Sequence, residues 1–257
     1  MTPAAPTDPE IEPDGAAPSW FSWLVFEAKR RALRLKRRVE DFAGGAARYG
    51  PGQNPARFSH IAGQSTTALW SSPSETQFRF ERGKVQNLRI AAAALDGIVI
   101  PAGGLFSFWR QVGPPTAARG FAEGRMLQQG CMVASVGGGL CQLSNSLFDA
   151  ALQADCAIVE RHAHSRIVPG SQAERGRDAT VAWNYVDLRF RPPTAMQLRV
   201  CLGAETLDVT LSQETPPEPR ISVLRLDAGP APALASSCAD CEKAACSRHE
   251  SMAPWPS

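Results

Sequence analysis

The chain has 257 residues, of which 44% are hydrophobic and 20% are charged. Such a composition is typical of a globular protein, and the length allows one sizeable core with tails or two small domains. A net charge of only +2 argues against a general affinity for nucleic acid. Residues 1–18 are acidic and proline-rich, unlike a secretory signal, and no apolar run reaches the roughly 18–20 residues of a membrane span. We therefore expect a cytoplasmic protein.

The N-terminal part is expected to precede the main domain. Residues 1–18 predict a disordered tail, and residues 19–43 predict a basic amphipathic helix with apolar positions three and four apart. Two interpretations of this helix stay open. It packs on its own domain with a solvated basic face, or residues 20–39 make a peripheral contact with an anionic membrane. Residues 44–79 are rich in Gly, Pro and Ser and predict a linker or lead-in.

Residues 80–213 are expected to form the single folded domain. Hydrophobic periodicity predicts helices over 84–95 and 140–154. Strands are predicted over 98–100, 105–109, 157–165 and 179–190, and a hairpin over 197–202 and 206–211. These elements favour an α+β fold with a central helix packed on a mostly antiparallel sheet, in an arrangement like that of papain-like enzymes.

The strongest candidate site lies where three glycines run into the 140–154 helix. Gly137, Gly138 and Gly139 permit positive φ angles and close approach of a ligand. Cys141 follows at the helix start, where the helix dipole favours an anion and lowers the pKa of a thiol. Gln142 can donate a hydrogen bond to an oxyanion.

A nucleophilic thiol needs a base and a group that orients the base. His162 or His164 can be the base, and Asp178 or Asn184 can orient it, which is the chain order of papain-like thiol enzymes. Ser144 and Asn145 are further polar positions on the helix that can bind a ligand. Six arginines either bind an acidic substrate such as a carboxylate or phosphate or form a solvated basic surface, namely Arg119, Arg125, Arg161, Arg166, Arg175 and Arg177.

Two other interpretations of Cys141 stay open. A lone cysteine is often a small buried helix residue, in which case the glycines only form a tight turn. Alternatively, Cys141, His162 and His164 hold a metal ion, if the strand and the helix converge.

Four ordered blocks of this sequence resemble the VanW family: FSFWRQVGPPTAARGFAEGRMLQQG, VGGGLCQLSNSLFDAAL, IVERHAHSRIV and GRDATVAWNYVDLRFRPPT. The likeness spans roughly residues 84–212. The family's GGG-[VL]-CQ-[VL]-S block fits Gly137 to Ser144, its HS pair fits His164, and its DAT block fits Asp178. Members occur beside glycopeptide-resistance genes and in many other bacteria, so the resemblance implies a cell-envelope context. Many carry a membrane anchor or wall modules ahead of this domain, where this chain has an acidic tail and a basic helix.

The expected function is that of a thiol-dependent hydrolase or transferase acting on an amide or peptide bond. Cys141 would be the nucleophile, His164 the base, Asp178 the orienting carboxylate and Gln142 the oxyanion donor. The alternative is a non-catalytic binding module that recognises an envelope peptide or a partner protein through the same pocket.

The C-terminal end carries a second constellation. Residues 214–237 predict a proline-rich linker, and residues 238–257 contain Cys238-x2-Cys241-x4-Cys246-x2-His249. Three thiols and an imidazole at this spacing predict a site for zinc or an iron–sulfur cluster. The alternative is a disordered tail with incidental cysteines.

Overall fold

A computed structural model describes residues 44–217, except 71–74, 129–130, 165–171 and 184, together with six single helical positions between 28 and 41. The expected tail over 1–18, Asn184 and the expected metal site at Cys238, Cys241, Cys246 and His249 lie outside the described residues.

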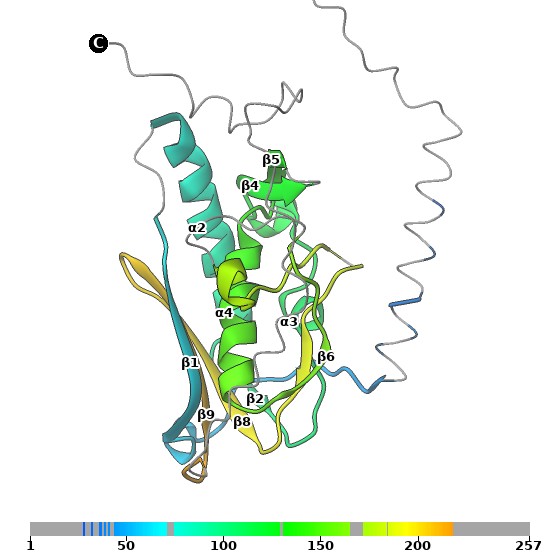
Figure 1. The fold of residues 1–257 in the computed structure, drawn as a ribbon, viewed down its shortest axis with the longest axis vertical. Coiled ribbons are helices and arrows are strands. Elements are labelled where there is room, and N and C mark those ends of the chain that lie inside the picture. Colours follow the sequence, from blue (N-terminus) through cyan, green and yellow to red (C-terminus); the bar gives the residue numbers. More distant parts are fainter. Residues whose placement is uncertain are drawn as a thin grey trace, which may run out of the picture.

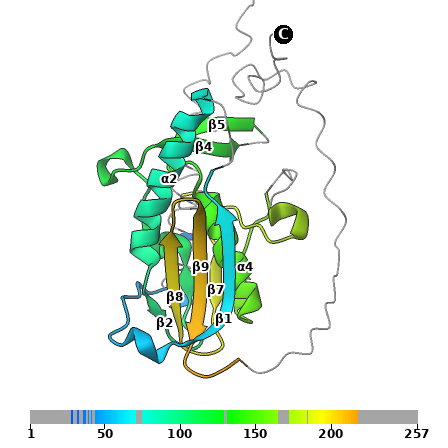
Figure 2. The same ribbon diagram turned by 90° about the vertical axis from the view of Figure 1, so that its left-hand side faces the viewer.

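The largest sheet is antiparallel and has four strands in the order β1-β9-β8-β2. They are β1 (His60–Ala68), β9 (Thr206–Gln213), β8 (Met196–Leu202) and β2 (Val99–Ile100). Figure 2 shows β9 between β8 and β1. Leu198 and Val200 of β8 and Leu207, Val209 and Leu211 of β9 are buried on one face, so the period-two pattern of the sequence correctly predicts this hairpin.

Two smaller antiparallel sheets complete the strands. One has the order β3-β7-β6 and contains β3 (Phe106–Ser107), β7 (Arg189–Arg191) and β6 (Ala157–Glu160). The other is the pair β4 (Glu123–Gln128) and β5 (Cys131–Val136), which the sequence did not suggest.

The helices are α2 (Glu75–Leu95), α3 (Phe108–Val112) and α4 (Leu140–Gln153), with short 3-10 turns η1 (Pro55–Arg57), η2 (Ala117–Arg119) and η3 (Gln172–Arg175). Helix α4 lies between the four-stranded sheet and β6, and α2 packs against β8 and β4 (Figure 1). Leu140, Leu143, Leu147 and Ala151 of α4 are buried in one core. The expected α+β domain with a central helix on mostly antiparallel sheets is confirmed.

Several strands are shorter than predicted, because side chains form hydrogen bonds with backbone groups where the strands were expected to continue. The strand expected over 105–109 ends at Ser107, whose hydroxyl caps α3 by accepting a hydrogen bond from the Arg110 amide. The strand expected over 157–165 ends at Glu160, and of the one expected over 179–190 only the part from Arg189 is a strand. The intervening backbone is bonded to α4 and to its own neighbours instead, as described below.

The lead-in expected over 44–79 contains β1 and the start of α2, so this expectation is wrong for those elements. The strand was hard to recognise because its inward positions are small or polar. A Cβ on Gly63 would meet the Ala150 carbonyl of α4, and the next inward residue is the buried Ser65. Close packing of strand on helix here replaces the usual apolar alternation.

The N-terminal helical positions contact the domain through charged side chains. Arg37 forms a double ion pair with Glu160 of β6, and Asp41 accepts from Arg189 of β7 at 2.9 Å. Val39 is 59% exposed, so this apolar position does not face the core. Membrane contact through residues 20–39 stays a prediction.

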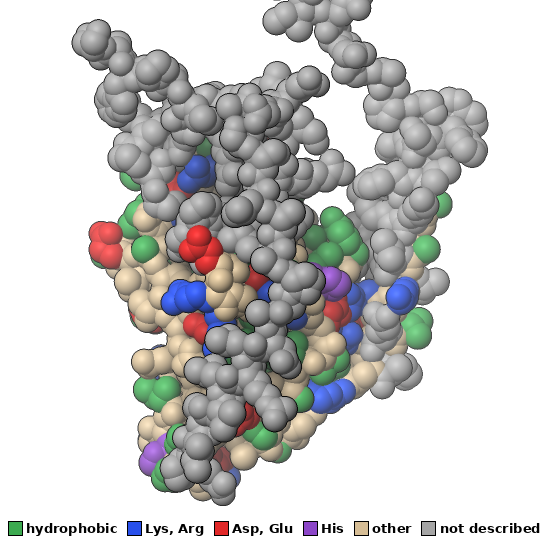
Figure 3. All heavy atoms as spheres, viewed as in Figure 1, with side chains coloured by type: hydrophobic (Ala, Val, Ile, Leu, Met, Phe, Trp, Pro, Cys, Tyr) green, Lys and Arg blue, Asp and Glu red, His purple; other side chains and the backbone are tan. Residues whose placement is uncertain are grey.

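Acidic and basic side chains are interspersed where described residues are visible in Figure 3, as the small net charge indicates. Within the described part of the chain, no helix combines the length and hydropathy that crossing a bilayer requires.

Candidate functional site

The triple-glycine turn fixes where α4 begins. Gly139, the N-cap, has φ 93° and Gly137 has φ 83°, both in the left-handed region that favours glycine. A Cβ on Gly138 would lie within 3.0 Å of backbone atoms of Gly124 in β4, and a Cβ on Gly124 would meet Gly138 in the same way. The glycines therefore serve close backbone packing, which places Cys141 in the first turn of α4.

Helix α2 holds this turn from the other side. Asn87 is fully buried, and its Nδ2 donates to the carbonyls of Ala122 and Gly138 at 2.9 Å each, while its Oδ1 accepts from the Ala122 amide at 2.8 Å. Sequence reasoning missed Asn87. The available signal was an amide side chain next to the buried apolar positions Val85 and Leu88 of the helix.

The structure brings Cys141, His164 and Asp178 together. The half-buried Cys141 thiol donates a 3.7 Å hydrogen bond to the Val181 carbonyl, and it lies near enough to His164 to raise the pKa of that imidazole. The Nδ1 atom of His164 lies 2.9 Å from Oδ2 of Asp178, and the His164 amide donates to the same oxygen at 2.6 Å. Since Asp178 occupies Nδ1, Nε2 is the ring nitrogen left for the sulfur.

Asp178 is itself held in place from two sides. Arg161 donates through Nε to the Asp178 carbonyl at 2.7 Å and through a terminal nitrogen to Oδ1 at 2.5 Å. The next residue, Ala179, is attached to α4, because its carbonyl accepts from Ser144 at 2.5 Å and its amide donates to Asn145 at 2.7 Å. Ser144 and Asn145, expected to bind a ligand, thus fix the Asp178 segment against the helix that carries Cys141.

The His164 imidazole and the Asp178 carboxylate each stabilise the charged form of the other. Burial, the largest single influence, lowers the pKa of His164, but hydrogen bonds and charges of Asp178 and Cys141 outweigh it and raise this pKa to about 9. Burial likewise raises the pKa of Asp178, but the hydrogen bonds from His164 and the charge of Arg161 lower it to about 2. The arrangement therefore favours an imidazolium next to the sulfur at neutral pH.

Two expected participants have other partners. The Nε2 of Gln142 donates to Thr67 Oγ1 at 3.0 Å and to the Ala68 carbonyl at 2.8 Å on β1, so both of its N–H groups are in use. Among the first-turn backbone amides of α4, that of Gln142 donates to the Gly139 carbonyl at 3.1 Å. The His162 ring is 51% exposed and lies 3.3 Å from Glu160. No three potential metal ligands among the described residues cluster around Cys141 or elsewhere.

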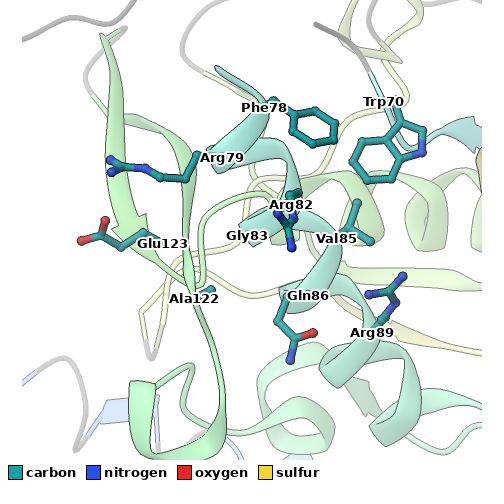
Figure 4. A pocket seen from close by; sticks show the side chains of 10 residues that line it. All are labelled: Trp70, Phe78, Arg79, Arg82, Gly83, Val85, Gln86, Arg89, Ala122 and Glu123. Carbon is teal, nitrogen blue, oxygen red and sulfur yellow. The ribbon is translucent and has the colours of Figure 1, made fainter. Parts of the chain in front are cut away.

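Two cavities lie outside the thiol–imidazole pair. One of about 740 Å³ runs along α2, between the Trp70–Phe78 ring stack and Arg82 and Arg89 (Figure 4), and has none of the three central residues in its lining. The other, of about 500 Å³, is lined by Trp183, which follows Val181 by two residues.

The arginines expected to bind an acidic substrate are mostly paired within the protein. The donors and their acceptors are Arg119 with Val112 and Pro114, Arg125 with Glu81, Arg161 with Asp178, and Arg177 with Asp149. Arg166 lies outside the described residues. The second cavity is lined by the expected Arg119 and also by Arg48 and Arg110, which sequence reasoning missed.

The fold and the site define a class of α+β domain in which a cysteine at a helix start is followed in the chain by a histidine and an aspartate. The family model described as VanW like protein matches residues 83–212, and the chain belongs to this family. The family expected from the sequence is thereby confirmed.

Two relatives extend the comparison. "Vancomycin B-type resistance protein VanW" of Enterococcus faecalis is 32% identical over 151 residues, which are 56% of this chain and 54% of the relative. "Uncharacterized protein YoaR" of Bacillus subtilis is 37% identical over 110 residues, 43% of this chain and 36% of the relative. The chain thus spans about half or less of these relatives. No solved structure matches it.

Proposed function

We propose that this protein is a cysteine-dependent hydrolase or transferase that acts on an amide bond of a cell-envelope molecule. The observation that carries the proposal is that the His164 ring, which lies 2.9 Å from the Asp178 carboxylate, is also influenced by the nearby Cys141 thiol. The name of the Enterococcus relative supports a link to glycopeptide resistance.

In the proposed reaction, the Cys141 thiolate attacks the carbonyl carbon of the amide. A protonated imidazole beside a thiol favours the thiolate, and backbone N–H groups at the start of α4 would stabilise the oxyanion. His164 then gives its proton to the departing amine as the C–N bond breaks. Water or a second amine attacks the thioester, releasing the thiol and forming an acid or a new amide.

The chain offers an internal control for thiol activation, because Cys201 is exposed on β8 and takes part in none of the imidazole contacts described above. Iodoacetamide labelling of both thiols, followed by peptide mass spectrometry from pH 6 to pH 8.5, tests the proposal. The labelling rate of an ordinary thiol falls roughly a hundredfold as the pH is lowered from 8.5 to 6. We expect the Cys141 rate to fall less than tenfold in the native protein.

His164→Ala should restore the steep pH dependence at Cys141 and leave Cys201 unchanged. Equally steep dependence at both thiols of the native protein would remove the catalytic proposal. It would leave the alternative of a binding module in which Cys141 is structural.

A further inference from the structure

The wall of the 500 Å³ cavity is connected to the thiol site through the backbone of residues 181–183. Its wall includes Trp183, two residues beyond Val181, whose carbonyl is 3.7 Å from the Cys141 sulfur. Since successive Cα atoms are 3.8 Å apart, the Cα of Trp183 is within about 7.6 Å of the Cα of Val181. The short stretch of chain from Val181 to Trp183 thus joins the residue bonded to the sulfur to the cavity wall, although none of Cys141, His164 and Asp178 lines the cavity.

Two indole rings form a fixed apolar wall of the cavity. Trp109 and Trp183 meet edge to face, with centroids 5.3 Å apart and an interplanar angle of 87°. Trp109 is buried and donates through Nε1 to the Val186 carbonyl at 2.8 Å, so its ring is held in place. Such a wall suits a flat apolar group.

The acidic side chains of the cavity are already satisfied. Asp187 is buried and accepts from the Ser107 hydroxyl at 2.5 Å, the Trp109 amide at 3.1 Å and its neighbouring Leu188 amide at 2.9 Å. Asp41 accepts from Arg189 at 2.9 Å. These carboxylates therefore offer little to a ligand beyond repulsion of a strongly negative group.

The arginine side chains of the cavity differ in how many of their N–H groups already have hydrogen-bond or ion-pair partners. Arg37 is paired with Glu160, and both terminal nitrogens of Arg119 donate to backbone carbonyls. Among the described residues, Arg48 has one hydrogen-bond partner, the Gln111 carbonyl at 3.1 Å. Arg110 is exposed, and within the described part of the chain its side chain makes no hydrogen bond or salt bridge, although its charge partly offsets the rise that burial causes in the pKa of Asp41. Unused guanidinium donors thus come from Arg48 and Arg110.

We propose that this cavity binds a carboxylate of the substrate, through Arg48 and Arg110, while an adjacent flat or apolar part of the same molecule packs on Trp183. A guanidinium pairs well with a carboxylate, and the two aspartates behind it disfavour a doubly charged phosphate. The inference rests on the proposed function, because it names the substrate class of the thiol site: an amide that also carries a carboxylate.

Binding of small probes to the full chain tests this assignment without any chemistry at the thiol. Hippurate carries an aromatic ring, an amide and a carboxylate, and hippuramide differs only in lacking the negative charge. Titration followed by the indole N–H signals of Trp109 and Trp183 in NMR spectra gives both dissociation constants. We expect hippurate to bind at least tenfold more tightly, with shifts at both indoles.

Arg110→Gln and Arg48→Gln should each reduce the preference for hippurate, and the double variant should abolish it. Arg82→Gln is the matched control, because Arg82 is an exposed arginine of the other cavity, on α2. Equal binding of the two probes would overturn the inference. So would a preference that survives in the double variant, or tighter binding of phenyl phosphate than of hippurate.

Cys141→Ser separates this inference from the catalytic proposal, since probe binding does not require the thiol. Hippurate preference in this variant, together with an inactive native thiol, would support a carboxylate-binding module and end the catalytic proposal. An activated thiol without hippurate preference would retain catalysis and remove the assigned substrate class.

Discussion

Asp178 controls both the position and the charge of His164. It accepts hydrogen bonds from the backbone amide and from Nδ1 of His164, and its other oxygen accepts from Arg161. A buried carboxylate with several donors stays ionised and favours a protonated imidazole. The carboxylate therefore does more than hold a ring in one orientation.

Asp178→Asn should lower the pKa of His164 by one unit or more from about 9, because the neutral amide no longer stabilises the imidazolium. An NMR titration of the imidazole C–H signals measures this. Asp149→Asn is a control, since Asp149 pairs with Arg177 and is not among the groups that affect His164. An unchanged His164 pKa in Asp178→Asn would show that the carboxylate does not set this charge.

Residue order, together with the family resemblance that favoured His164 over His162, allowed the cluster of Cys141, His164 and Asp178 to be predicted, but not the direction of every side chain. Cys141, His164 and Asp178 converge as expected. Gln142 fails as an oxyanion donor in its present contacts because one helical step turns a side chain by roughly 100°, which directs it towards β1. Arg48 and Arg110 escaped prediction because their cavity joins segments far apart in the chain.

At the scale of elements, regular periodicity decided what could be predicted. Helix α4 and the β8–β9 hairpin have long apolar repeats and were located within one or two residues. Strand β1 faces α4 with Gly63 and Ser65, so its sequence shows no apolar alternation. Strands β4 and β5 form a two-stranded sheet apart from the four-stranded one, and their sequences also gave no apolar alternation. These elements are specified by contacts with α4 and α2 rather than by local sequence.

The contact between α2 and the glycine turn depends on one buried amide. Asn87→Ala should lower the free energy of unfolding by about 2–4 kcal/mol, because groups of Ala122 and Gly138 lose their partner in a buried place. Urea unfolding measures the change. The neighbouring exposed Gln86 provides a control, and Gln86→Ala should stay within about 0.5 kcal/mol of the native protein. Equal effects of the two substitutions would contradict this role of Asn87.

At the scale of the whole molecule, the protonation of His164 couples the site to stability. The pKa of His164 in the folded protein is about 9, above the ordinary value of 6.5. The stability that protonation of the ring adds to the fold is therefore fully present below pH 6.5 and is lost as the pH rises through 9. The shift corresponds to at most about 3 kcal/mol, because His164 and Asp178 titrate as a pair.

Urea unfolding of the native protein and of His164→Gln between pH 6 and pH 10 tests this coupling. The stability difference between the two proteins should be largest near pH 6 and should shrink as the pH passes 9. A difference that stays constant over this range would mean that the native fold does not favour the protonated ring.

The attachment of Ala179 to α4 has a consequence for when the sulfur can react. Cys141 belongs to the helix, whereas His164 and Asp178 belong to the chain that leaves β6, and Ser144 and Asn145 join the two. A nascent or partly opened chain keeps the cysteine but separates it from its acid–base partner. Under the proposed function, the arrangement that activates the thiol is thus complete only once the domain has folded.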